Sequence, residues 1–158
     1  MTTAEERLRE LGLSLPETAT PVANYVPSAR TGNLLFVAGQ VPRKDDGSIL
    51  AGKLGGDTGG DVGVDAAYQA ARSCGLLALA AVKQALGDLE KVVRVVRVMG
   101  LVNAAPDFTQ QPAVINGFSD LMVEVFGDRG RHARVAYGVG SLPGGAVVEV
   151  ESLFEVRD

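Results

Sequence analysis

Apolar residues recur along the chain at two different spacings, and these spacings predict where helices and strands lie. Over residues 64–86 they stand three or four positions apart, as on one face of a helix, and Gly87 then suits a helix end. Residues 108–127 predict a second helix that begins near Pro112. Residues 4–11 predict a short leading helix. We therefore expect two long helices and one short one.

Runs of β-branched and apolar residues, separated by turn-forming residues, predict five strands. Glycines, prolines and the KDDGS stretch at residues 44–48 mark the turns between them. After the leading helix the elements follow the order β-β-α-β-α-β-β, which predicts an α+β fold with a single sheet and two helices packed on one face. The strands are expected at residues 33–42, 49–54, 91–104, 133–142 and 146–156.

The length and composition fit a single domain. The chain has 158 residues, 46% of them hydrophobic, and no charge-rich or proline-rich break divides it. We expect residues 1–21 to form the leading helix and an extended lead-in, and residues 22–158 to form the core. Two helices cover only one face of a sheet, so apolar residues on the other face would remain exposed to water. We therefore expect the protein to self-associate through that face.

Charge and residue counts narrow the classes of partner. The formal net charge is −4, which does not favour nucleic acid. One cysteine and one histidine cannot make a zinc site, so neither a metal nor another cofactor is expected. The charged N-terminus lacks a signal-peptide pattern, and no apolar run is long enough to cross a membrane. These observations indicate a cytoplasmic protein without membrane association.

A glycine-rich stretch at residues 55–63 invites comparison with phosphate-binding loops. It lacks the lysine of a P-loop and carries two aspartates that would repel an anion. A flexible lead-in to the following helix explains it better than a nucleotide site does. The chain also lacks a G-x-S-x-G elbow and a Rossmann glycine pattern, so neither a nucleophilic serine nor nicotinamide chemistry is indicated.

The last two predicted strands carry charged residues in otherwise apolar surroundings. With a period of two, Glu149 and Glu151 share one face of their strand, and the valines between them share the other. Arg134 likewise faces away from Val135 and Tyr137. Because a short turn joins the two strands, we expect a hairpin that places Arg134 and the glutamates together on the face opposite the helices.

Several interpretations of this cluster stay open from the residues alone. The glutamates can be ordinary solvated strand positions, or Arg134 can pair with them in a structural salt bridge. Alternatively, the guanidinium binds a small carboxylate through two parallel hydrogen bonds, and a glutamate orients or deprotonates a water molecule. His132 is either an acid–base group or an exposed turn residue.

The segments NLLFVAGQVP and ARVAYGVGSLPGGAVVEVE resemble the Rid family of reactive intermediate deaminases, also called the YjgF-like or endoribonuclease L-PSP family. The similarity spans about residues 22–156. It implies a fold similar to that of chorismate mutase and a homotrimer with three clefts between subunits. It also implies hydrolysis of small 2-imino acids, or of their enamine tautomers, to 2-keto acids and ammonia.

The resemblance also implies roles for individual residues. Arg134 would hold the substrate carboxylate, and Glu149 would position the water that attacks the C=N carbon. Tyr25 would close the cleft, and Gly39 would offer a backbone N–H. The scheme needs no metal or other cofactor.

Four positions depart from the family pattern, and they bear on the choice of substrate. Ala38 stands where serine is usual, and Val135 follows the arginine where serine is common. Ala136 replaces a cysteine of some members, and Tyr137 replaces a small aliphatic residue. One lost hydrogen bond at Ala38 costs about 0.5–1.5 kcal/mol, which would weaken turnover rather than abolish it. We expect Ala38, Ala136 and Tyr137 to line the substrate site.

The leading hypothesis is a trimeric, cofactor-free deaminase that hydrolyses small carboxylate-bearing imines or enamines. The alternative is a non-catalytic sensor or carrier of a small carboxylate, which would use Arg134 but not Glu149. Ribonuclease activity, which one of the family's names suggests, is opposed by the acidic charge and by the lack of a second histidine.

Overall fold

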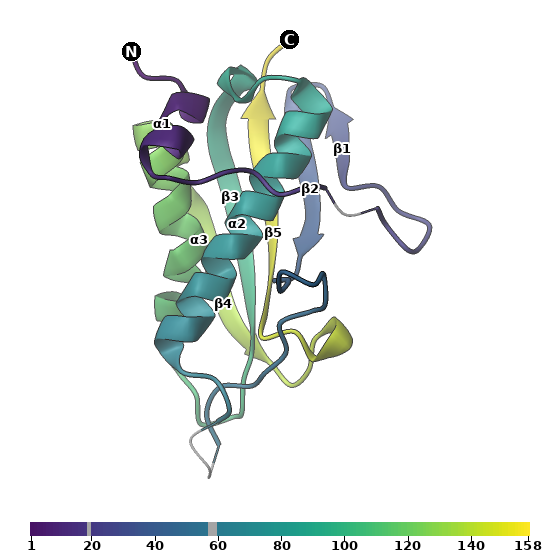
Figure 1. The fold of residues 1–158 in the computed structure, drawn as a ribbon, viewed down its shortest axis with the longest axis vertical. Helices are drawn as coiled ribbons and strands as arrows, with labels where there is room; N and C mark the ends of the chain where they lie inside the picture. The colour runs from purple at the N-terminus through teal and green to yellow at the C-terminus, as the bar shows by residue number, and fades with distance from the viewer. Residues whose placement is uncertain (19, 57–59) are drawn as a thin grey trace.

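Five strands form one mixed sheet, and two long helices pack against one of its faces (Figure 1). This arrangement is that of a computed structural model, which describes residues 1–18, 20–56 and 60–158. The strands lie in the order β1-β2-β5-β3-β4; β3 and β4 run parallel, and the other neighbours run antiparallel. The predicted α+β fold, with one sheet and two helices on one face, is confirmed. The strands are β1 (Ser28–Thr31), β2 (Leu34–Gln40), β3 (Val92–Asn103), β4 (Ala133–Val139) and β5 (Val148–Val156).

The helices begin and end where their local sequences favour it. The first follows a capping box in which Thr3 and Glu6 satisfy each other's backbone N–H. The second ends at Gly87, which is left-handed, and the third has Pro112 in its first turn. None of the helices in the described residues combines the length and apolar character needed to cross a membrane. The helices are α1 (Ala4–Glu10), α2 (Val64–Leu86) and α3 (Gln111–Phe126), with short 3-10 turns η1 (Leu89–Lys91), η2 (Gly127–Gly130) and η3 (Pro143–Gly145).

Glycines allow α2 and α3 to approach each other closely over the sheet. A β-carbon added at Gly117 of α3 would collide with the backbone oxygen of Tyr68 in α2. A β-carbon added at Gly75 of α2 would lie 2.8 Å from the side chain of Leu121 in α3. The close pair buries one continuous core between the helices and the sheet.

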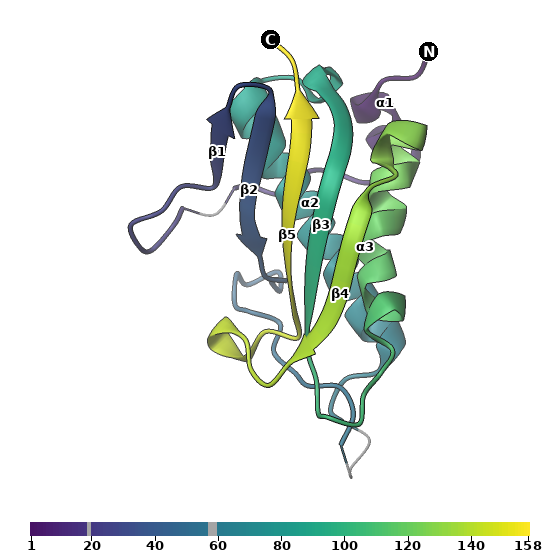
Figure 2. The same cartoon turned by 180° about the vertical axis from the view of Figure 1, so that it is seen from behind.

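One face of the sheet is buried under the helices, and the other is open. Figure 2 views the molecule with the open face in front. Along β5 the valines 148, 150 and 156 and Phe154 are buried, whereas Glu149, Glu151 and Glu155 are half-buried on the open side. The prediction that the apolar set of this strand faces the helices is therefore confirmed.

The expected hairpin between the last two strands is wrong. β3 lies between β4 and β5, and it pairs in parallel with β4 and antiparallel with β5. The connection runs through η3 and is held by a hydrogen bond from Gly52 N to Gly145 O and by the bridge between Ala51 and Ala146. It therefore crosses the end of β3 instead of turning back on β4.

The expected position of Arg134 on the open face is also wrong. Its register partner is Val98, which is fully buried, and Ala136 pairs with Gly100, which faces α3. Arg134 and Ala136 thus lie on the helix side of β4. Because β4 is the edge of the sheet, the helix surface above it is partly polar and accepts an arginine, as the contacts below show.

The strand expected at residues 49–54 is replaced by isolated bridges. The partner of β2 is instead β1, and a two-residue turn of Gly32 and Asn33 joins them. Gly32 has a φ of 57°, which suits glycine. Because β1 and β5 occupy both edges of β2, residues 49–54 find no free strand edge there. Within the glycine-rich stretch 55–63, for which we expected a flexible lead-in, residues 57–59 lie outside the described residues.

The open face presents apolar side chains to solvent. Phe36, Val135 and Tyr137 are 45%, 42% and 41% exposed. Their register partners across the sheet are Leu153, Met99 and Leu101. An apolar surface of this kind on a sheet marks an interaction site more often than a solvated face.

We predict that Gly117→Ala destabilises the fold. The new β-carbon would force α2 and α3 apart, and overpacking of this kind costs about 1–3 kcal/mol. Gly140→Ala is the control, because a β-carbon there meets nothing within 4 Å. Denaturant unfolding at one fixed protein concentration measures both. Equal stability of the two variants would show that the helices are not held at this distance.

Candidate functional site

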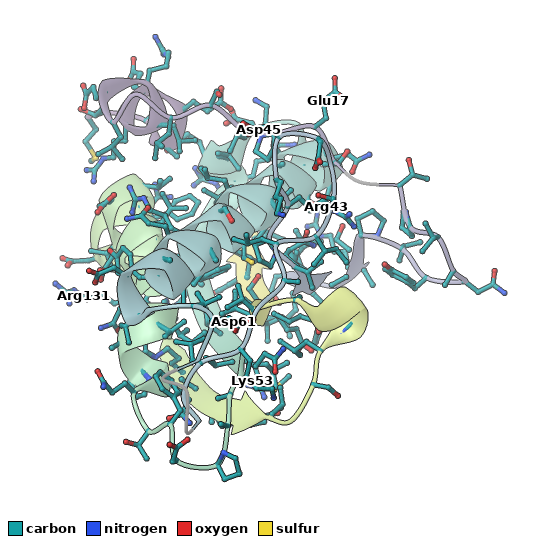
Figure 3. The ribbon with its side chains drawn as sticks, turned by 60° about the horizontal axis from the view of Figure 1, so that its bottom comes forward. Glu17, Arg43, Asp45, Lys53, Asp61 and Arg131 are labelled. Carbon is teal, nitrogen blue, oxygen red and sulfur yellow. The ribbon has the colours of Figure 1, made fainter. Side chains whose placement is uncertain are left out.

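Tyr25, Ala38 and Gly39 line one hollow beside β2, with a volume of about 100 Å3. Leu77 of α2 also lines it, and so does Arg43 from the loop that follows β2 (Figure 3). Sequence reasoning placed the first three residues in the site but missed Arg43. The guanidinium of Arg43 donates to the backbone oxygen of Gly47 in its own loop.

A bulge in β2 brings Gly39 against Glu149. Between Val37 and Gln40 this strand advances three residues while β5 advances two, so one extra residue is accommodated. A β-carbon added at Gly39 would lie 2.5 Å from Oε1 and 3.1 Å from Cδ of Glu149. The lack of a side chain at Gly39 therefore leaves room for the glutamate carboxyl.

Glu149 has the electrostatic setting of a better proton acceptor than a solvated glutamate. Burial raises its pKa above the ordinary value, and the neighbouring charge of Glu151 raises the pKa further. A carboxylate with a raised pKa binds a proton more readily than a solvated one. It therefore suits the role of a general base toward water.

Tyr137 shares the open face with Glu149 but stands two strands away. Leu101 of β3 pairs with Glu149 on one side and with Tyr137 on the other. Two strand spacings separate their backbones by about 10 Å. The Tyr137 hydroxyl lies 3.8 Å from Sδ of Met99, to which it donates a weak hydrogen bond.

Arg134 lies on the helix side of the sheet edge and is held by neutral acceptors. Its Nη1 donates to Oδ1 of Asn116 at 2.8 Å and to Oγ of Ser119 at 3.1 Å. Its Nη2 donates to the backbone oxygen of Pro112 at 3.5 Å. Among the described residues no carboxylate pairs with Arg134, so the structural salt bridge with the glutamates is wrong.

Three residues around Arg134 were missed or misread from the sequence. Asn116 and Ser119 are three positions apart in α3, and this spacing of two polar residues within an apolar helix was the available signal. His132 is half-buried rather than exposed. Its Nε2 lies 2.9 Å from Oγ of Ser119, and its Nδ1 lies 2.7 Å from the oxygen of Gly130.

One chain does not bring Arg134 and Glu149 together. They stand on opposite faces of the sheet, and β3 separates their strands. The predicted site residues thus form two groups. Tyr25, Ala38, Gly39 and Glu149 gather around β2 and β5, whereas Arg134, Ala136 and Tyr137 belong to β4.

A wider hollow of about 540 Å3 lies at the far end of β4. Gln111, Gly138 and Lys53 are among its lining residues, and Nζ of Lys53 donates to Gly140 O at 2.7 Å. Figure 3 shows Lys53 well apart from Arg43. Within residues 1–18, 20–56 and 60–158, no three His, Cys, Asp or Glu side chains gather closely enough to hold a metal ion.

Comparisons with known proteins give matches over nearly the whole chain. The chain is 45% identical over 152 residues to protein TCP17 of Trypanosoma cruzi, covering 96% of this chain and 92% of that protein. The crystal structure of Atu1372 from Agrobacterium tumefaciens, described as having unknown function, is 46% identical. It superimposes with a TM-score of 0.87 and covers 98% of this chain and 92% of its own.

A more distant structure shares the fold. RidA from an Antarctic Psychrobacter is 20% identical, with a TM-score of 0.61 over 89% of this chain and 94% of its own. The family described as YjgF/chorismate mutase-like matches residues 5–156. Because this match includes both the bulged strand with Gly39 and the edge strand with Arg134, the chain belongs to the Rid/YjgF family.

Proposed function

We propose that this protein hydrolyses small 2-imino acids, or their enamine tautomers, to 2-keto acids and ammonia. The observation that carries the proposal is the setting of Arg134, a guanidinium fixed by neutral acceptors and paired with no carboxylate of the described residues. Such a cation at an open sheet edge is suited to bind the carboxylate of a ligand. Membership of the Rid/YjgF family agrees with this reaction.

The complete site requires more than one subunit. Glu149 lies on the open face, and Arg134 lies across the sheet at its β4 edge, so each chain supplies two incomplete halves. We infer a homotrimer in which the β4 edge of one subunit meets the β2–β5 part of the next. This assembly also covers the apolar open face around Phe36 and Val135.

The proposed reaction balances without a cofactor. Arg134 holds the substrate carboxylate, and Glu149 takes a proton from water as the water oxygen bonds to the C=N carbon. Glu149 then returns this proton to the nitrogen and relays the hydroxyl proton of the tetrahedral intermediate to the nitrogen as well. The C–N bond breaks as the C=O bond forms, and ammonia leaves with a 2-keto acid as the second product. Tyr25 and Gly39 line the hollow beside β2, and Gly39 lies against the Glu149 carboxyl, so both residues would meet a substrate bound there.

The substituted positions bear on which imine is accepted. Ala38 offers no hydroxyl to the substrate, and Ala136 is a small apolar residue on the same side of β4 as Arg134. Tyr137 places an aromatic ring on the open face. Together they favour an apolar substrate side chain over a hydroxylated one.

We predict that the wild-type protein is a trimer and that Phe36→Glu weakens it. A charge at this position would be buried against an apolar partner surface, which is unfavourable. Leu11→Glu is the control, because Leu11 is similarly exposed but lies at the end of α1, far from the sheet. Light scattering at micromolar concentration measures both. A monomeric wild-type protein would overturn the trimer and the shared site together.

We predict that Arg134→Lys fails nearly as badly as Arg134→Ala. Lysine keeps the charge but lacks the planar pair of donors, and hydrogen bonds to charged groups contribute about 1.5–3 kcal/mol. Both variants should lose about ten- to a hundredfold in kcat/KM toward freshly generated 2-imino acids. The melting temperature should stay near that of the wild type, because Arg134 is not part of the core. Normal kinetics in both variants would remove the carboxylate-binding role.

We predict that Glu149 sets the acid limb of the pH profile. Activity needs the ionised carboxylate, so it should fall as pH drops through the raised pKa of Glu149, at a higher pH than an ordinary glutamate would give. Glu151→Gln removes a like charge and should lower the pKa of Glu149, moving the limb to lower pH. Glu155→Gln, on the same face but further along β5, should leave it in place.

Glu149→Gln separates an enzyme from a carrier. It should abolish turnover while binding of a 2-keto acid persists. Full turnover in this variant would exclude Glu149 as the base, and binding without turnover in the wild type would identify a carrier of small carboxylates.

A further inference from the structure

A chain of hydrogen bonds extends from Arg134 through Ser119 to His132. Nη1 of Arg134 lies 3.1 Å from Oγ of Ser119, and this oxygen lies 2.9 Å from Nε2 of His132. Nδ1 of the same ring lies 2.7 Å from the backbone oxygen of Gly130. This series of hydrogen bonds thus links the edge strand β4, the helix α3 and the turn η2.

The direction of each hydrogen bond follows from the groups at its ends. The Gly130 carbonyl only accepts, so Nδ1 of His132 carries a proton. In the neutral ring Nε2 is then an acceptor, and the Ser119 hydroxyl donates to it. The lone pairs on Oγ of Ser119 remain free to accept from Arg134, which only donates. Every donor in the chain therefore meets an acceptor only while His132 is neutral.

We propose that Ser119 and His132 are positioning residues that hold Arg134 in the orientation for binding a carboxylate. The neutral imidazole turns the Ser119 hydroxyl away from Arg134, and the exposed lone pair fixes Nη1. Asn116 fixes the same nitrogen from the neighbouring turn of α3. The role rests on the proposed function of Arg134, because its purpose is to present that guanidinium to a ligand.

The surroundings of the ring favour the neutral form. Burial lowers the pKa of His132, the hydrogen bond to Gly130 opposes this effect, and the charge of Arg134 lowers the pKa further. From α3 the ring meets the uncharged Ser119. On the chain segment before the ring, Asp128 and Arg131 pair with each other at 3.3 Å. If His132 were protonated, the Ser119 oxygen would accept from both His132 and Arg134, and the Ser119 proton would lose its acceptor on the imidazole.

Binding of an anion to Arg134 should change the pKa of His132. An anion bound to the guanidinium offsets its charge, and the pKa of His132 should then rise. Removal of the Arg134 side chain should also raise the pKa of His132. Because the chain has a single histidine, one set of ring resonances reports both changes without assignment by mutation.

Nitrogen-15 NMR of the imidazole is the first test, and it does not depend on turnover. We expect a neutral ring protonated at Nδ1, with a pKa below the ordinary value. Arg134→Ala should raise this pKa, and so should saturation of the wild type with pyruvate, the simplest 2-keto acid. A ring protonated at Nε2, or a pKa that is indifferent to Arg134→Ala, would overturn the proposed chain.

Kinetics of matched variants are the second test. Ser119→Ala should raise KM by about three- to tenfold with kcat nearly unchanged, because a binding contact is weakened equally in the ground and transition states. His132→Asn keeps a donor for Gly130 but loses the acceptor for Ser119, whereas the longer His132→Gln can still accept. We therefore expect His132→Gln to have a KM closer to that of the wild type than His132→Asn has.

The control is Ser73→Ala, since the Ser73 hydroxyl donates to Ala70 O within α2 and takes no part in the hydrogen bonds between Arg134, Ser119 and His132. It should leave KM unchanged. In an Arg134→Ala background, Ser119→Ala should add nothing to KM. A KM increase that persists in this background would show that Ser119 acts by a route other than Arg134.

The two proposals fail in different ways. If Arg134→Ala leaves turnover normal, the proposed function is wrong, whatever the ring resonances show. If Arg134→Ala abolishes activity while Ser119→Ala and both His132 variants keep wild-type KM, the function stands and the positioning role is wrong. Should a variant fail to fold, the wild-type tautomer and its response to pyruvate still decide the matter.

Discussion

The pairing of β3 between β4 and β5 determines what a single chain can do. Had the last two strands formed a hairpin, one subunit would hold a guanidinium beside a carboxylate, and the two would neutralise each other. The inserted strand keeps these charges on separate strands and on opposite faces of the sheet. Among the described residues neither group has a partner of opposite charge, so both stay available to interact with a third molecule.

In the proposed trimer, this separation would also tie assembly to activity. The open face carries Phe36, Val135 and Tyr137, which are unfavourable in water, and Glu149 emerges on that same face. Covering the face would exclude water from around the carboxylate and from around any bound substrate. A subunit contact would then contribute to stability and to the electrostatics of the site through one and the same surface.

The sequence was sufficient for elements whose signal is local. The spacing of apolar residues and the terminal Gly87 located α2, and period-two alternation assigned the faces of β5 correctly. It was insufficient for pairing, which depends on contacts between segments far apart in the chain. The short turn after β4 suggested a hairpin because nothing local in residues 133–156 records that β3 is inserted between the strands.

The candidate site shows the same division. Gly39 and Glu149 were predicted as site residues from motifs, and the structure brings the two residues close together. The face of Arg134 was misread because an arginine on the helix side contradicts the usual rule for buried faces, which weakens at a sheet edge. Ser119 and His132 were missed as its partners because their relation to Arg134 appears only when α3 lies over β4.

The bulge in β2 makes the room left for the Glu149 carboxyl depend on the length of that strand. Two residues, Ala38 and Gly39, stand where the partner strand has one, Glu151, and this offset aligns the position without a side chain with the carboxyl of Glu149. A deletion of Gly39 would restore regular alternation and at the same time remove the position without a side chain from beside the Glu149 carboxyl. Insertions and deletions in this strand are therefore constrained far more tightly than substitutions in the neighbouring loops, so alignment gaps across relatives should avoid it.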